Sequence, residues 1–373
     1  MTMTGSSSDA GETGHGTDRD AETEAFLERL RRIVPPEEGA DHPVVAGVTI
    51  LETVARGGMG VVYRGRDEAT GGDVAVKVLR GLEGLSPSVL TRARREGEIL
   101  SRLHHPNIVR VLRCDDCTVP HPGAEPVPAI VMEWVGGGTL ERCCGSERLG
   151  PAEAAGVVRD LARAVAEVHA LGVIHRDIKP ANVLLMPRIR PGALPVAKLA
   201  DFGLARRDRF ETRLTRDGAV VGTPGFLAPE QAGIDPTLSE VGPSTDVHGL
   251  GAILYWLLAG KPPYEARTTA ATLQLAARGE ATPLSSVTPR LPRDLVTIVE
   301  KCLAHRPSRR YRSAGALADD LDRFLAHRPI HARRAGPGER LAKWARCHPA
   351  RVATIVTAAV ALVGLIANTV QYV

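Results

Sequence analysis

The sequence predicts an α+β protein with two lobes, a small strand-rich lobe followed by a larger helical one. Short segments with apolar alternation occupy the chain from about Val48 to Val135. Long helical patterns dominate from Pro151 onward. A short stretch dense in polar residues, 175–182, lies between apolar segments, as the floor of a cleft between two lobes would. The chain of 373 residues is 43% hydrophobic, enough to form a core of this kind.

The small lobe is expected to consist mainly of strands. Val74, Val76 and Val78 alternate with residues of other kinds, as a strand with two different faces requires. The expected strands are 48–55, 60–67, 73–80, 108–114 and 128–135. Residues 115–128 carry four prolines and are expected to form a loop.

Helices are expected at four places. A charged helix over 90–103 interrupts the strands, and Gly97 inside it costs roughly 1 kcal/mol relative to alanine. The first helix of the large lobe begins at Pro151, a favourable first helical residue, and ends at Gly172. Further helices are expected at 247–260 and 292–304.

Composition excludes several classes of protein. The net charge of +4 and the aromatic content of 3% do not predict a nucleic-acid-binding surface, so we expect no nucleic acid partner. Six cysteines in a chain of this length do not make a disulfide scaffold. The C-x-x-C of Cys114 and Cys117 would suit zinc, but Cys143 and Cys144 are adjacent and lack the matching spacing. We therefore expect reduced thiols.

A glycine-rich segment, VARGGMGVVYRG at 54–65, matches the phosphate-covering pattern G-x-G-x-x-G-x-V. Gly57, Gly60 and Val62 are in register, whereas Ala55 stands at the first glycine position. Alanine costs little there if its φ is negative, and about 1 kcal/mol or more if φ is positive. We expect a working loop.

Two polar motifs follow apolar segments in the second half. VIHRDIKPANVLL, at 173–185, contains Asp177, Lys179 and Asn182, and KLADFGLA contains Asp201. Apolar flanks would hold such short polar loops rigidly, as preorganised catalysis requires. GTPGFLAPE follows at 222–230.

The ordered set of glycine loop, V-A-V-K, H-R-D-x-K-P-x-N, D-F-G and A-P-E resembles the protein kinase family over about residues 48–325. Lys179 and the Gly-Thr-Pro at 222–224 are similar to the serine/threonine class, and the composition resembles bacterial members. The resemblance implies the two-lobed protein kinase fold and transfer of the ATP γ-phosphate to protein Ser/Thr hydroxyls.

The resemblance also implies residue roles. Asp177 would orient the substrate hydroxyl and accept its proton, and Lys179 would offset charge on the γ-phosphoryl group. Asn182 and Asp201 would hold Mg²⁺, which prefers oxygen ligands. Lys77 would hold the ATP phosphates, positioned by Glu96 or Glu98. Glu96 fits better because apolar residues follow it at three and four positions. The other expected ATP contacts are Val54, Gly57, Gly60, Val62, Ala75, Met132 as gatekeeper, Glu133, Val135 and Leu184.

Regulation and architecture follow from the same resemblance. Arg176 beside Asp177 implies control by phosphorylation, and Thr212 and Thr215 are the candidate sites, against the alternative of solvated threonines. A homodimer would permit trans-autophosphorylation. Asp246 and the pair of Glu230 and Arg310 would brace the large lobe.

The two ends of the chain differ from the domain between them. Residues 1–45 are rich in small and acidic residues, which predicts a disordered tail. Residues 352–373 lack charge, and a helix of that length rises about 33 Å, enough for a hydrocarbon core of about 30 Å. The basic segment 326–351 precedes this expected transmembrane helix, which predicts a single-pass membrane protein with a cytoplasmic kinase domain. A buried or partner-bound helix is the alternative.

Two other functions stay open at this point. A pseudokinase would bind ATP or assemble partners without transferring phosphate, and Ala55 and Gly97 favour it slightly. A small-molecule kinase is disfavoured by the segment from Gly222 to Glu230. Lys77, Asp177, Asn182 and Asp201 together favour the protein kinase.

Overall fold

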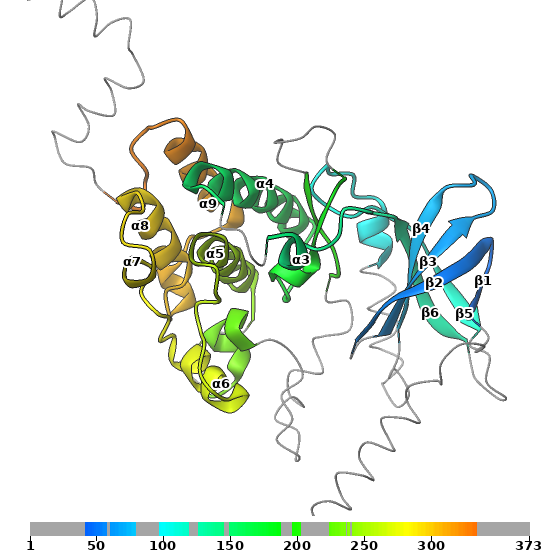
Figure 1. Ribbon diagram of the computed structural model, residues 1–373, viewed down its shortest axis with the longest axis horizontal. Coiled ribbons are helices and arrows are strands. Elements are labelled where there is room, and N and C mark those ends of the chain that lie inside the picture. Colours follow the sequence, from blue (N-terminus) through cyan, green and yellow to red (C-terminus); the bar gives the residue numbers. More distant parts are fainter. Residues whose placement is uncertain are drawn as a thin grey trace, which may run out of the picture.

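The molecule has the predicted α+β, two-lobed arrangement, with strands gathered at one end and long helices at the other (Figure 1). The computed structural model describes residues 42–57, 60–79, 97–118, 126–144, 149–187, 196–202, 224–235, 237–238 and 241–333.

The small lobe is a closed antiparallel sheet in the order β1-β2-β3-β4-β6-β5. The two-residue β1 closes it by pairing with both β2 and β5. Alternate residues of β3 and β4, namely Val61, Tyr63, Val74, Val76 and Val78, fill its interior. The strands are β1 Val44–Val45, β2 Val48–Gly57, β3 Gly60–Asp67, β4 Asp73–Leu79, β5 Val111–Thr118 and β6 Val127–Glu133.

The register of the central strands brings predicted ATP contacts together. Val62 on β3 lies opposite Lys77 on β4, and Ala75 lies opposite Met132 on β6. Two consecutive strands and the more distant β6 therefore bring these residues together in the sheet.

The prediction for residues 108–118 was partly wrong. Strand β5 begins at Val111 and continues to Thr118, through residues expected to form a loop. The polar run is compatible with a strand because Arg113 forms an ion pair with Asp115 at 2.7 Å. The end of the strand also gains a partner, since Cys117 pairs with Val45 of β1.

The large lobe is organised around α5, whose residues are buried on nearly every side. This helix packs against α4, α8 and α9 (Figure 1). The predicted helix starts and ends agree within a few residues. The helices are α3 Leu140–Cys144, α4 Pro151–Ala170, α5 Pro243–Ala259, α6 Thr269–Arg278, α7 Leu284–Val287, α8 Arg293–Cys302 and α9 Ala314–Leu325. The short 3₁₀ segments are η1 Pro180–Asn182, η2 Pro224–Phe226, η3 Pro229–Ala232 and η4 Pro307–Arg309, and the strands β7 Val183–Leu185 and β8 Ala197–Leu199 form a hairpin-like pair.

The folded domain extends beyond the predicted end at residue 325. The buried carboxylate of Asp320 accepts hydrogen bonds from the backbone N–H groups of His331, at 2.6 Å, and Ala332, at 2.9 Å. Ile330 is also buried, with 4% of its surface exposed. The first residues of the predicted linker are thus part of the packed domain.

Several predictions fall outside the described residues: the tail up to residue 41, most of the helix at 90–103, residues 203–223, and the segment from 334 to 373 with the expected transmembrane helix. Among the residues that the structure does describe, no helix combines the length and the apolar character needed to cross a membrane.

Candidate active site

The polar loop between α4 and β7 gathers the predicted catalytic residues around Asp177. The Asn182 amide nitrogen donates to the Asp177 carboxylate at 2.9 Å and to its backbone carbonyl at 2.8 Å. The Lys179 ammonium lies 3.2 Å from the same carboxylate. Because Asn182 is the last residue of η1 and directly precedes β7, these bonds fix Asp177 relative to the strand pair β7–β8.

The buried carboxylate of Asp246 in α5 holds this loop from below. It accepts hydrogen bonds from the backbone N–H groups of His175 and Arg176, both at 2.8 Å, and lies 2.7 Å from the ring of His169. Arg176 has a φ of 66°, a conformation that costs a non-glycine residue roughly 1–3 kcal/mol. Asp246 therefore stabilises a strained backbone directly before Asp177.

Close packing beneath the loop also depends on α5. A Cβ atom at Gly249 would lie 2.7 Å from the Cβ of Ile178, so the glycine allows the helix to approach the loop. Ile178 lies between Asp177 and Lys179, and it is 5% exposed. The packing thus fixes the loop at its centre.

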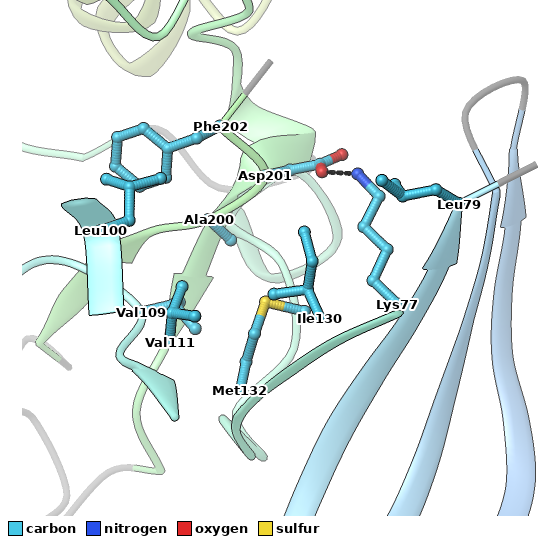
Figure 2. A pocket seen from close by; sticks show the side chains of 10 residues that line it. All are labelled: Lys77, Leu79, Leu100, Val109, Val111, Ile130, Met132, Ala200, Asp201 and Phe202. Carbon is cyan, nitrogen blue, oxygen red and sulfur yellow. Dashed lines mark hydrogen bonds and ion pairs between the residues drawn. The ribbon is translucent and has the colours of Figure 1, made fainter. Parts of the chain in front are cut away.

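Asp201 follows β8 and faces the small lobe. Its carboxylate pairs with the Lys77 ammonium from β4 (Figure 2). Asp201 also has a positive φ, 65°, which turns its side chain out of the line of the strand. The contact joins the two lobes across the cleft.

The two polar motifs are linked through His175 and Ala200. The buried ring of His175 lies 2.9 Å from the Ala200 carbonyl oxygen, and the Ala200 N–H donates to the Asn182 carbonyl at 2.8 Å. The rings of His175 and Phe202 are 4.7 Å apart. A displacement of either motif would therefore disturb the other.

A small cavity of about 30 Å³ lies beside the pair of Lys77 and Asp201 (Figure 2). Its wall is mainly apolar and comes from both lobes. The lining residues are Lys77, Leu79, Leu100, Val109, Val111, Ile130, Met132, Ala200, Asp201 and Phe202.

Comparison with known proteins identifies this arrangement. Residues 48–321 match the family model described as the protein kinase domain. The chain belongs to the protein kinase family. Serine/threonine-protein kinase PknB of Mycobacterium tuberculosis is 37% identical over 283 residues, which cover 75% of this chain and 43% of that protein. Serine/threonine-protein kinase Pkn1 of Myxococcus xanthus is 33% identical over 293 residues, covering 78% of this chain and 40% of that protein.

A solved structure agrees with these sequence matches. The PknI kinase domain of Mycobacterium tuberculosis superimposes with a TM-score of 0.55 and 26% identity, covering 77% of this chain and 99% of that chain. The relatives are bacterial serine/threonine kinases, so the chain resembles the bacterial branch of the family. It spans about two fifths of the length of the curated relatives named above.

The glycine loop of the kinase contains β2, β3 and their connection. Gly57 and Gly60 pair at the tip, and residues 58–59 lie outside the described residues. Ala55 is in extended strand conformation opposite Val62, so alanine at this position carries no left-handed strain. A Cβ atom at Gly60 would overlap the carbonyl oxygen of Val78, so this position requires glycine.

The remaining predicted ATP contacts lie on three different segments. Val54 lies on β2 and is 47% exposed, Val135 is buried just after β6, and Leu184 lies on β7. The predicted Lys77 partner, Glu96, and the candidate phosphosites, Thr212 and Thr215, lie outside the described residues.

Glu133 has a role that the sequence did not predict. Its carboxylate accepts hydrogen bonds from the Lys198 ammonium at 2.7 Å and from the Arg110 backbone N–H at 2.9 Å. Its own N–H donates to the Arg110 carbonyl at 3.0 Å and is thus engaged within the protein. Glu133, the last residue of β6, is therefore connected to Arg110 and to Lys198 of β8. Because β6 and β8 belong to different sheets, only the tertiary structure reveals the contact with Lys198.

The predicted architectural pair is confirmed in its geometry. Glu230 and Arg310 form two parallel bonds of 2.6 and 2.7 Å, with both side chains essentially inaccessible to solvent. Arg310 also donates to the carbonyls of Ser244, Ala304 and His305. Such charge-assisted, bidentate pairing anchors the segment after η2 to the large lobe.

Proposed function

We propose that this chain is an active protein kinase that transfers the γ-phosphoryl group of ATP to serine and threonine hydroxyls of proteins. The observation that carries the proposal is the meeting of Lys77 with Asp201, 124 residues apart, beside the loop of Asp177 and Asn182. A pseudokinase usually lacks one of these four residues, and all four are present.

Asp177 would orient the substrate hydroxyl and receive its proton. The bond from Asn182 fixes the direction of the carboxylate, and the Asp246 network beneath it limits movement of the backbone. Lys179, whose ammonium group lies 3.2 Å from the Asp177 carboxylate, would offset negative charge on the transferring phosphoryl group.

The donor set suits a divalent cation such as Mg²⁺. The amide nitrogen of Asn182 donates to Asp177, so the amide oxygen of Asn182 points away from Asp177 and would be available to the cation. Asp201, which pairs with Lys77 across the cleft, would supply a carboxylate. Hard oxygen ligands of this number leave room for phosphate oxygens and water, the usual partners of Mg²⁺. When bound, the cation neutralises phosphate charge.

The nucleotide would lie between the lobes. Val62, Ala75 and Leu184 would contact the adenine base, with Met132 at its inner edge and the backbone of Glu133 and Val135 beside it. Val54, Gly57 and Gly60 would cover the ribose and phosphates. Lys77 would donate to the phosphates. The sheet register supports this assignment because it brings Ala75 opposite Met132 and Val62 opposite Lys77.

Regulation and location extend the proposal beyond the described residues. Thr212 and Thr215 would be autophosphorylated between two copies, and the phosphate would pair with Arg176. Residues 352–373 would anchor the chain in a membrane, with the basic linker and the kinase domain on the cytoplasmic side.

Incubation of the purified full chain with labelled ATP tests the activity. We expect incorporation into the chain and into a basic Ser/Thr protein with Mg²⁺, none with EDTA, and none in an Asp177→Asn variant. Nucleotide binding without any transfer, in the presence of Mg²⁺ and at high protein concentration, would argue for the pseudokinase.

The same preparation tests the copy-to-copy reaction and the anchor. The wild type should phosphorylate the Asp177→Asn chain at Thr212 or Thr215, and label elsewhere would contradict these sites. Expressed in bacterial cells, the full chain should sediment with membranes after a carbonate wash, whereas a chain ending at residue 351 should not. Equal release of both would contradict the anchor.

A further inference from the structure

Gly97 occupies a position where helix propensity favours alanine by about 1 kcal/mol. It begins the described part of the helix, residues 97–101. The residue is buried, and a Cβ atom there would lie 2.7 Å from the Sγ atom of Cys114 on β5. Tertiary packing therefore accounts for glycine at position 97, whereas helix propensity does not.

Cys114 serves as a packing group in this contact. It pairs with Ile130 across β5 and β6 and packs partly buried against the main core. Burial raises the pKa of its thiol, so the sulfur stays protonated at neutral pH and behaves as a small apolar atom. The backbone of Cys114 is fixed by the sheet, because the residue lies within the paired part of β5.

The same face of the helix reaches the active site. Leu100 follows Gly97 by three residues, which places both on one side of the helix. Leu100 is 2% exposed, and it lines the small cavity together with Val111 of β5 and Phe202 (Figure 2). Phe202 directly follows Asp201, so the contact, the cavity and the catalytic carboxylate form one continuous packed unit.

The space at this contact is limited. Ordinary van der Waals contact begins at 3.4 Å, so a methyl group at position 97 would require its Cβ and the Cys114 Sγ to separate by about 0.7 Å or more, through a shift of the helix away from β5 or a rotation of the Cys114 side chain. The neighbouring cavity of about 30 Å³ is little larger than one water molecule and offers little room for adjustment. Displacements of about 1 Å can lower catalytic rates by up to about 100-fold.

We propose that the close approach of Gly97 to Cys114 sets the distance of this helix from β5, and that Gly97 is thereby a positioning residue for phosphoryl transfer through Leu100, Phe202 and Asp201. This inference rests on the proposed kinase activity. It does not depend on the placement of Glu96, the preceding residue.

A double-mutant cycle on the full chain tests the contact. The variants are Gly97→Ala, Cys114→Ala and the two combined, with Gly156→Ala as the matched control, because a Cβ at that position in α4 meets no atom within 4 Å. The measurements are kcat, KM for ATP and the midpoint of thermal unfolding.

We expect Gly97→Ala to lower kcat at least about tenfold, with a smaller change in KM and no matching loss of thermal stability. Cys114→Ala and Gly156→Ala should stay within about twofold of wild type, and the double variant should recover to within about threefold. Should Gly97→Ala alone not fold, recovery of folding and activity in the double variant supports the contact.

Wild-type kcat in Gly97→Ala would overturn the inference, and so would a double variant no more active than Gly97→Ala. An inactive wild type would instead contradict the proposed function. The two failures are therefore distinguishable in the same experiment.

Discussion

Replacement of Asp246 by asparagine tests whether the buried carboxylate holds the catalytic loop in its strained conformation. The carboxylate accepts from the backbone N–H groups of His175 and Arg176 and lies against His169. Asparagine keeps one oxygen but turns an NH₂ group toward a donor. A hydrogen bond to a charged group contributes about 1.5–3 kcal/mol, and a buried donor without an acceptor adds a cost of similar size. We expect Asp246→Asn to lower the free energy of unfolding by about 3 kcal/mol.

The same substitution should impair catalysis more than stability alone explains. With one of the two acceptor bonds lost, the backbone at Arg176, with its φ of 66°, can relax and carry Asp177 away from Asn182. We expect kcat to fall about 100-fold at temperatures where the variant remains folded. Denaturant unfolding and steady-state phosphorylation of a protein substrate measure the two effects.

Asp319→Asn on α9 is the matched control. Asp319 also forms an ion pair, 2.8 Å from Arg163, but its side chain is 57% exposed. Its replacement should cost less than about 1 kcal/mol and leave kcat unchanged. The reasoning would be refuted if Asp246→Asn lost less than about 1 kcal/mol and kept kcat within about twofold of wild type.

Three further predictions concern other parts of the molecule. Glu133→Gln weakens the bond to Lys198, and we expect a several-fold higher KM for ATP with little change in kcat; an unchanged KM would show that the contact does not position the base site. Gly249→Ala brings a methyl group 2.7 Å from Ile178, and we expect about 1–3 kcal/mol lower stability and reduced kcat, with normal values in both assays as the contrary result. Hydrogen bonds from Arg113 and Thr70 lower the pKa of Asp67 to about 2 from its usual 3.8, so its stabilising effect is present above pH 4 and is lost as the pH falls toward 2. The difference in thermal midpoint between wild type and Asp67→Asn should therefore shrink over that range, and a constant difference would contradict the assignment.

Local sequence patterns predicted the strands β2 to β6 and the helices α4, α5 and α8, whereas β1, β7, β8 and the helices α3, α6, α7 and α9 were not predicted. Helix α4 begins at Pro151, as predicted, where the Glu153 carboxylate accepts from the N–H of Gly150. Strands β3 and β4 follow their apolar alternation. Strand β5 was underestimated because the four prolines at 115–128 predicted a loop over that whole range, whereas the strand continues to Thr118. The pairing of β1 with Cys117 depends on segments that are distant in sequence.

The catalytic residues were predictable for a different reason. One short motif keeps Asp177 close to Asn182 within a single loop. That Lys77 and Asp201 belong to the same site was predicted from the resemblance to the protein kinase family. No such motif marks the residues that hold those groups in place. Glu133 resembles any acidic residue at a strand end until β8 brings Lys198 to within 2.7 Å of it.

At Gly97, helix propensity and tertiary packing lead to opposite interpretations. Considered as part of an isolated helix, Gly97 lowers the stability of that helix, and in the sequence it slightly favoured the pseudokinase. In the folded chain the missing side chain is what lets the helix lie against Cys114, with Leu100 beside Phe202. In the proposed positioning role, a residue that weakens its own helix strengthens the arrangement around Asp201, because the cost is local and the packing it permits extends through Leu100 to Phe202.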